Sequence, residues 1–148
     1  MTQSIEPKSI VLYADDDPED RELVTEAFKP YGHHVEVITF PDGITLLSHL
    51  RNMPPLDSTP CLIIIDINMP LLNGRETLEQ LRQMDRFDNV PVVLFTTSSM
   101  PQDKGFAQRH KAGFITKPID IGQLEQITDE FISHCTEEIQ RKIRRKMM

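Results

Sequence analysis

The sequence predicts an α/β fold, a doubly wound sheet of five parallel strands with helices on both faces. Five short apolar runs alternate with five stretches whose apolar residues recur at helical spacing, the pattern of repeated strand–helix units. In the third run, residues 62–65 read Leu-Ile-Ile-Ile, so both faces of that strand are apolar. A central parallel strand covered by helices on both sides requires this pattern.

The predicted strands are rich in Val, Ile, Leu and Phe, and they occupy residues 9–14, 35–40, 61–65, 92–95 and 113–116. The predicted helices have apolar stripes within residues 23–28, 44–50, 78–84, 102–111 and 124–135, of which 102–111 has the weakest pattern. Residues 52–60 contain three prolines, so we expect an irregular loop there.

The start of the first helix is predicted by Asp17-Pro18-Glu19-Asp20. Asp is a preferred N-cap residue, and Pro is favoured at the first helical position. Acidic residues in the first turn interact well with the helix dipole. We therefore expect Asp17 to cap this helix rather than to bind a ligand.

The net charge of −7 is distributed unevenly along the chain. Five cations and no acids lie in the last eight residues, so residues 1–140 carry −12. An acidic body disfavours nucleic-acid binding, because phosphate recognition relies on positive charge. Cations and basic surfaces are its expected ligands.

The length of 148 residues corresponds to one domain. We expect a flexible N-terminus over residues 1–8, a folded domain over 9–135 and a basic C-terminal helical extension over 136–148. No apolar run reaches the ~18 residues of a membrane span. The polar N-terminus lacks the apolar region of a signal peptide, so a cytoplasmic location is predicted.

The basic tail can continue the last helix, with an apolar stripe at Ile139, Ile143 and Met147. Solvation of the tail is the favoured interpretation, because cations suit a helix C-terminus. Contact with an anionic membrane, nucleic acid, a partner helix or a second copy of the chain is the alternative.

Polar side chains follow four of the five predicted strands where each strand ends: Asp15 and Asp16, Asp66, Thr96, and Lys117. Open parallel sheets bind ligands at the carboxyl ends of their strands, so these residues should share one crevice. Clustered carboxylates suit Mg2+, which would also relieve the repulsion between the aspartates.

Asp66 is the natural nucleophile of this set, because it stands alone at the end of the most apolar strand. A carboxylate can attack phosphorus to form an aspartyl phosphate. Phosphoryl transfer mainly needs positioning and charge neutralisation, which Mg2+, Lys117 and Thr96 can supply.

These residues resemble the receiver domain of bacterial response regulators, which has a flavodoxin-like fold. The resemblance covers residues 9–135 and rests on four motifs in order: the acid pair, DINMP..NG at 66–74, PVVLFTTS at 91–98 and GFITKP at 113–118. The spacing of 30 residues from Asp66 to Thr96 and 21 from Thr96 to Lys117 makes the combination specific.

The resemblance implies a role for each matching residue. Asp66 corresponds to the phosphoacceptor, and the domain would catalyse its own phosphorylation and dephosphorylation without being a metabolic enzyme. Mg2+ would be held by Asp15, Asp16, Asp66 and the backbone carbonyl of Asn68.

The resemblance also implies a switch and its partners. Thr96 and Lys117 would bind the phosphoryl oxygens, and Phe114 would turn inward as Thr96 moves. A sensor histidine kinase or a histidine phosphotransfer protein would donate the phosphoryl group. Too few residues follow residue 135 for a DNA-binding output domain, so we expect signalling by protein contact. A homodimer through the fourth helix, fifth strand and fifth helix, or through the C-terminal extension, is a further expectation.

The sequence departs from the common receiver pattern at two places near the site. Leu71-Leu72 replaces a smaller pair that often contains Gly, and Thr97 replaces Ala or Gly. Neither change removes a catalytic group. We expect them to affect the rate of dephosphorylation and the fit of partner proteins, and not the chemistry of phosphorylation.

Two other functions compete with this interpretation. A Mg2+-dependent phosphohydrolase of the haloacid dehalogenase type would also use an aspartyl nucleophile, but it needs a second Asp where this chain has Asn68. A receiver-like binding module that is not phosphorylated is the other alternative, and the complete set of site residues argues against it.

Overall fold

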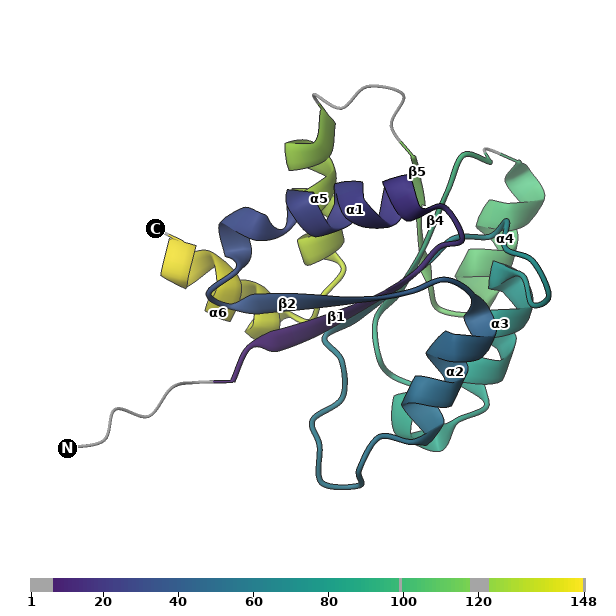
Figure 1. The fold of residues 1–148 in the computed structure, drawn as a ribbon, viewed down its shortest axis with the longest axis horizontal. Coiled ribbons are helices and arrows are strands. Elements are labelled where there is room, and N and C mark those ends of the chain that lie inside the picture. The colour runs from purple at the N-terminus through teal and green to yellow at the C-terminus, as the bar shows by residue number, and fades with distance from the viewer. Residues whose placement is uncertain (1–6, 99, 118–122, 148) are drawn as a thin grey trace.

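The computed structural model describes residues 7–98, 100–117 and 123–147. Its centre is a sheet of five parallel strands in the order β2-β1-β3-β4-β5 (Figure 1). The strands are β1 Ser9–Ala14, β2 Val35–Phe40, β3 Leu62–Ile65, β4 Val92–Thr96 and β5 Gly113–Thr116. The predicted fold class is confirmed, although β3 begins one residue later than expected and β4 continues through Thr96.

The helices cover both faces of the sheet, as Figure 1 shows. On one face lie α1 Pro18–Ala27, α5 Leu124–Ser133 and α6 Glu137–Met147; on the other lie α2 Gly43–Arg51, α3 Gly74–Arg82 and α4 Pro101–Arg109. Two short 3-10 helices, η1 Lys29–Tyr31 and η2 Asp85–Phe87, follow α1 and α3.

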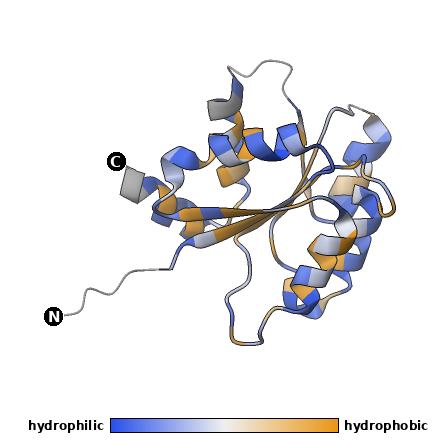
Figure 2. Ribbon diagram, in the orientation of Figure 1, coloured by the Kyte–Doolittle hydropathy of each residue, from blue (hydrophilic) through white to orange (hydrophobic). Residues whose placement is uncertain are grey.

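Two hydrophobic cores result, one on each side of the sheet. Alternate residues of β1 enter different cores: Leu12 joins α2, α3 and α4, whereas Val11 joins α1, α5 and α6. The same alternation occurs in β3, where Ile63 and Ile64 are both fully buried on opposite sides. Figure 2 shows the apolar residues of the helices turned towards the sheet. This explains why the central strands have no polar face.

The predicted start of α1 is confirmed. Asp17 is the N-cap, and its side chain accepts a hydrogen bond from the Glu19 amide at 2.9 Å. Pro18 occupies the first turn.

Residues 52–60 form the predicted irregular loop, and one arginine holds it in place. Arg86 in η2 donates to the carbonyls of Met53 (3.0 Å), Pro54 (2.8 Å) and Asp57 (2.6 Å). The Asp57 amide also donates to the Pro54 carbonyl at 3.0 Å, which closes a turn.

The C-terminal tail does not continue α5, which corrects one expectation. α5 ends at Ser133, and α6 begins at Glu137 as a separate helix. Ile143 is only 1% exposed within the core of α1 and α5, and Ile139 packs against it. The Gln140 side-chain amide bonds the carbonyls of Ser133 and Cys135, so it bridges the break between the two helices. The apolar side of α6 is therefore covered by its own domain.

Within the described part of the chain, no helix has both the length and the apolar character of a membrane span.

Candidate functional site

The carboxyl ends of the strands place the predicted residues on one edge of the sheet. β1 and β3 are paired up to Ala14 and Ile65, and the Asp66 amide donates to the Ala14 carbonyl at 3.0 Å. The residues that follow, Asp15 and Asp66, are therefore neighbours. Lys117 is held in the same way beside β4, because its amide donates to the Thr96 carbonyl at 2.8 Å.

Three carboxylates meet at this edge. Asp15, Asp16 and Asp66 each offer an oxygen, and these oxygens lie within 4.8 Å of one another. Asp15 and Asp66 are buried, at 0% and 4% exposure, whereas Asp16 is exposed. Oxygen ligands at this spacing suit a hard divalent cation, so the donor set fits Mg2+.

Asn68 is an exposed residue of the loop that follows β3. Its backbone amide faces Asp66 Oδ1 at 3.4 Å, a long hydrogen bond. Gly74, at the start of α3, approaches the same strand end so closely that a Cβ there would lie 2.3 Å from the Asp66 carbonyl oxygen. Only glycine allows α3 to begin at this distance from Asp66.

Lys117 supplies the positive charge of the site. Its Nζ lies 2.8 Å from Asp15 Oδ2, 3.2 Å from Asp66 Oδ2 and 2.7 Å from Asp20 Oδ2. Burial acts to lower the pKa of the ammonium, but its hydrogen bonds to Asp15 and Asp20 and the charge of Asp66 raise it above the ordinary value. The lysine therefore stays charged.

Asp20 is a site residue that the sequence analysis missed. It lies in the first turn of α1, where an acid is already explained by the helix dipole. Its ion pair with Lys117 joins residues 97 positions apart, so no local signal could have indicated it.

Asp15 accepts further hydrogen bonds from its own surroundings. The Tyr13 hydroxyl donates to Oδ2 and the Asp17 amide donates to Oδ1 at 2.9 Å. Tyr13 is fully buried, and its pKa is raised by burial and by the charge of Asp15, so it remains a donor.

The pKa of Asp66 is raised to about 6 by burial; Lys117 opposes this rise and Asp15 adds to it. A second cation beside Asp66 would favour its ionised, nucleophilic form.

The two predicted switch residues lie on neighbouring strands. Thr96 is fully buried at the end of β4, and its Oγ1 accepts a hydrogen bond from the Ser98 amide at 3.3 Å. Phe114, on β5, is half-buried against the core on the α4 side of the sheet. The Lys104 ammonium from α4 lies 5.9 Å from the centre of its ring.

Comparison with known proteins decides the family, because the response regulator receiver domain family matches residues 11–129. The chain belongs to the response regulator receiver family. This receiver is therefore a component of two-component signalling. One relative is response regulator Rcp1 of Synechocystis, 30% identical over 105 residues, which are 70% of this chain and 71% of Rcp1. Another is the protein PilH of Pseudomonas aeruginosa, 30% identical over 112 residues, or 74% of this chain and 86% of PilH.

Solved receiver structures share the fold. The phosphorylated cyanobacterial phytochrome response regulator RcpA superposes with a TM-score of 0.77 at 26% identity, over 88% of this chain and 98% of RcpA. The Mn2+-bound form of Rcp1 gives a TM-score of 0.74 at 28% identity, over 86% of this chain and 93% of the Rcp1 chain.

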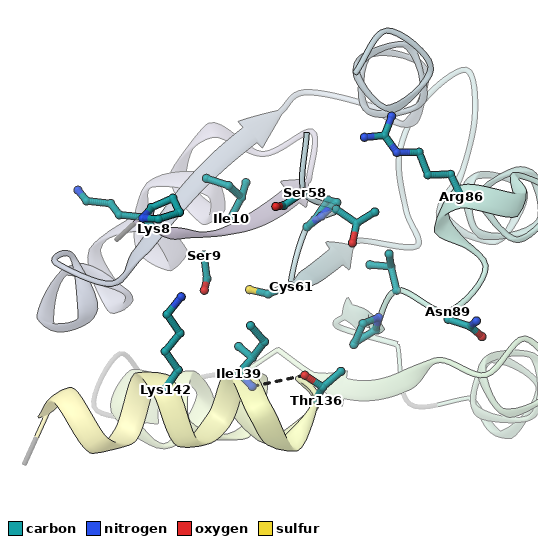
Figure 3. Close-up of a pocket in the computed structure, with 15 residues that line it drawn as sticks. Lys8, Ser9, Ile10, Ser58, Cys61, Arg86, Asn89, Thr136, Ile139 and Lys142 are labelled. Carbon is teal, nitrogen blue, oxygen red and sulfur yellow. Dashed lines mark hydrogen bonds between the residues drawn. The ribbon is translucent and has the colours of Figure 1, made fainter. Parts of the chain in front are cut away.

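A cavity of about 380 Å³ lies at the opposite end of the sheet from the carboxylates of this receiver (Figure 3). It opens between the start of β1, the 52–60 loop and α6, and the Cys61 side chain reaches into it. None of the predicted site residues lines this cavity.

Proposed function

We propose that this receiver accepts a phosphoryl group onto Asp66 in the cytoplasm, with Mg2+, and then signals through protein contacts. The observation that carries the proposal is the position of Asp66, buried at the end of β3 between two other carboxylates and the Lys117 ammonium. A carboxylate in this setting is close both to oxygen ligands for a cation and to a fixed positive charge.

The carboxylates of Asp15, Asp16 and Asp66, with the Asn68 carbonyl, are the groups that would hold Mg2+. When bound, the ion would neutralise charge on the phosphoryl oxygens. Asp15 would be kept in place by Tyr13 and by the Asp17 amide, which already bond to its two oxygens.

In the proposed reaction, an Asp66 oxygen attacks phosphorus in line with the leaving group. The new oxygen–phosphorus bond forms as the phosphorus–nitrogen bond of a phosphohistidine breaks, and its electron pair remains on the imidazole nitrogen. Lys117 would exchange part of its contact with Asp66 for a phosphoryl oxygen, and the Thr96 hydroxyl would bond a second oxygen.

The proposed donor is a sensor histidine kinase or a histidine phosphotransfer protein. Support comes from a relative, the hybrid signal transduction histidine kinase D of Dictyostelium discoideum, in which a matching segment occurs within a kinase. That segment is 35% identical over 123 residues, or 82% of this chain and 7% of the kinase.

The test is to incubate the protein with Mg2+ and a small phosphodonor such as acetyl phosphate, and to look by mass spectrometry for an acid-labile phosphoryl group at Asp66. We expect labelling of the wild type, none in Asp66→Asn, and strongly reduced labelling in Asp16→Ala. Asp17→Ala is the matched control, because Asp17 caps α1 and should cost only about 1 kcal/mol of stability. Absence of labelling in the wild type would refute the proposal.

A further inference from the structure

A chain of hydrogen bonds connects the buried Thr96 to α3 and α4. The Ser98 amide donates to Thr96 Oγ1 at 3.3 Å, and the Ser98 hydroxyl donates to Asp103 Oδ2 at 2.7 Å. The other oxygen of Asp103 accepts from Arg75 Nε at 2.9 Å and also from Arg75 Nη2. Arg75 belongs to α3 and Asp103 to α4, so the chain joins the end of β4 to both helices.

Asp103 is the central member of this chain. It is a carboxylate at only 5% exposure, and a charge so buried requires partners. The Ser98 hydroxyl and then Arg75 lower its pKa against the opposing effect of burial. With both oxygens engaged, the position of Asp103 depends on Ser98 and Arg75 together.

The same residues also control where α4 begins. Met100, the N-cap residue of α4, has no side-chain cap, and its amide donates to the Ser98 hydroxyl at 3.3 Å. The Arg75 guanidinium lies 5.4 Å from the centre of the Phe106 ring, one turn further along α4. Movement of Ser98 therefore changes contacts along the first two turns of α4.

We propose that Ser98, Asp103 and Arg75 form a latch that holds Thr96 in its unphosphorylated position and couples Asp66 to α4. The inference rests on the proposed function, because it requires Thr96 to move towards a phosphoryl group. When the Thr96 hydroxyl bonds a phosphoryl oxygen, the Ser98 amide loses its acceptor and Ser98 must reorient. The Ser98–Asp103 bond opposes that movement. Asp103 is thus a positioning residue that acts through Ser98 and does not touch the reacting atoms.

The latch predicts that breaking it favours the phosphorylated arrangement. A ligand binds more tightly when the competing state is destabilised. Beryllium trifluoride mimics a phosphoryl group on a carboxylate, so its affinity in the presence of Mg2+, measured by calorimetry, reports this balance. We expect Ser98→Ala to tighten binding about two- to tenfold, the equivalent of one net hydrogen bond.

Four further variants make the test specific. Asp103→Ala removes the acceptor of the same bond and should also tighten binding. The double variant Ser98→Ala/Asp103→Ala should bind little more tightly than either single variant, because both substitutions remove one bond. Ser98→Thr keeps the hydroxyl and should retain wild-type affinity. Ser133→Ala removes a hydroxyl that bonds the Glu130 carbonyl on α5, and it should have no effect. Unchanged or weaker binding by Ser98→Ala would overturn the inference.

Hydrogen exchange separates this inference from the proposed function. In the ligand-free protein, Ser98→Ala should speed the exchange of the α4 amides, whereas the amides of α2 should be unaffected. If the wild type binds no beryllium trifluoride, the proposed function fails, and the exchange rates still decide whether the bonds hold α4. Unchanged α4 exchange would overturn the latch whatever the outcome of the titration.

Discussion

At the scale of single residues, the site is a balance of charges around one ammonium. Lys117 contacts three carboxylates, and of these Asp15 and Asp66 are almost completely buried. Burial is the main reason that the pKa of Asp66 rises to about 6; the charge of Lys117 opposes this rise, and the charge of Asp15 adds to it. The ionised site is therefore costly to the folded protein in the absence of a divalent cation.

This cost predicts how Asp66→Asn changes stability with pH. The folded-state pKa of about 6 lies above the ordinary value of 3.8, so ionised Asp66 destabilises the fold above pH 6. The cost disappears below about pH 4, where the carboxyl is protonated in both states. In EDTA at pH 7, removing the charge with Asp66→Asn should raise the free energy of unfolding by about 1–3 kcal/mol. Loss of the ion pair with Lys117 reduces this gain.

Urea unfolding of both proteins at pH 7 and near pH 4 checks this expectation. The gain should shrink towards zero at the lower pH. Saturating Mg2+ should also reduce it at pH 7, because binding stabilises the wild type more than the variant. An equal difference at both pH values would show that burial of the Asp66 charge is not the cause.

At the scale of elements, the loop between β3 and α3 contains a strained residue beside the site. Leu71 has a φ of 67°, in the left-handed region, and its side chain is 85% exposed. Its neighbour Leu72 packs against the core, so Leu71 is the exposed member of this apolar pair. A non-glycine residue in this conformation costs about 1–2 kcal/mol of stability. Because the Leu71 side chain is exposed, its burial does little to offset this cost.

Leu71→Gly should therefore stabilise the protein. Relief of the left-handed strain outweighs the extra backbone entropy of glycine, so we expect a gain of about 0.5–1 kcal/mol in unfolding free energy. Leu56→Gly is a matched control, because Leu56 is 99% exposed in a loop and does not have a positive φ. Leu56→Gly should be neutral or slightly destabilising. Equal effects of the two substitutions in thermal or urea unfolding would rule out strain at Leu71.

At the scale of the whole molecule, α6 completes one of the two cores. Ile143 lies at 1% exposure among residues of α1 and α5, and Arg144 pairs with Asp129 of α5 at 3.1 Å. The cations of the tail thus lie on a helix whose apolar side packs against the core of its own domain. The tail is a structural part of the domain as well as its main concentration of positive charge.

Ile143→Ala should cost about 2–4 kcal/mol of unfolding free energy, as expected when a buried Ile is truncated and leaves a cavity. Arg141→Ala, two residues earlier in the same helix, is the control. Arg141 is 71% exposed and pairs only with Glu137 among the described residues, so its loss should change stability by less than about 0.5 kcal/mol. If Ile143→Ala unfolded at the same urea concentration as the wild type, α6 would not contribute to the folded core.

The sequence by itself determined the features that depend on local pattern. Apolar runs and helical stripes fixed the five parallel strands and their order of alternation with helices, because burial on two faces leaves no polar positions in central strands. The N-cap at Asp17 followed from Asp-Pro at a helix start. Because open parallel sheets bind ligands at the carboxyl ends of their strands, the sequence also predicted that Asp15, Asp66 and Lys117 lie together.

Only the tertiary structure decided the contacts that depend on how helices are rotated and packed. Asp20 and Lys117 are 97 residues apart, and Arg75 and Asp103 are 28 apart. Each of these acids has an adequate local explanation as a first-turn residue, so the sequence cannot tell which one turns inward. The same holds for α6, whose stripe could have faced solvent, a partner or its own domain. Which alternative is realised depends on the shape of the surface against which each helix packs, and that surface forms only when the strands and helices come together.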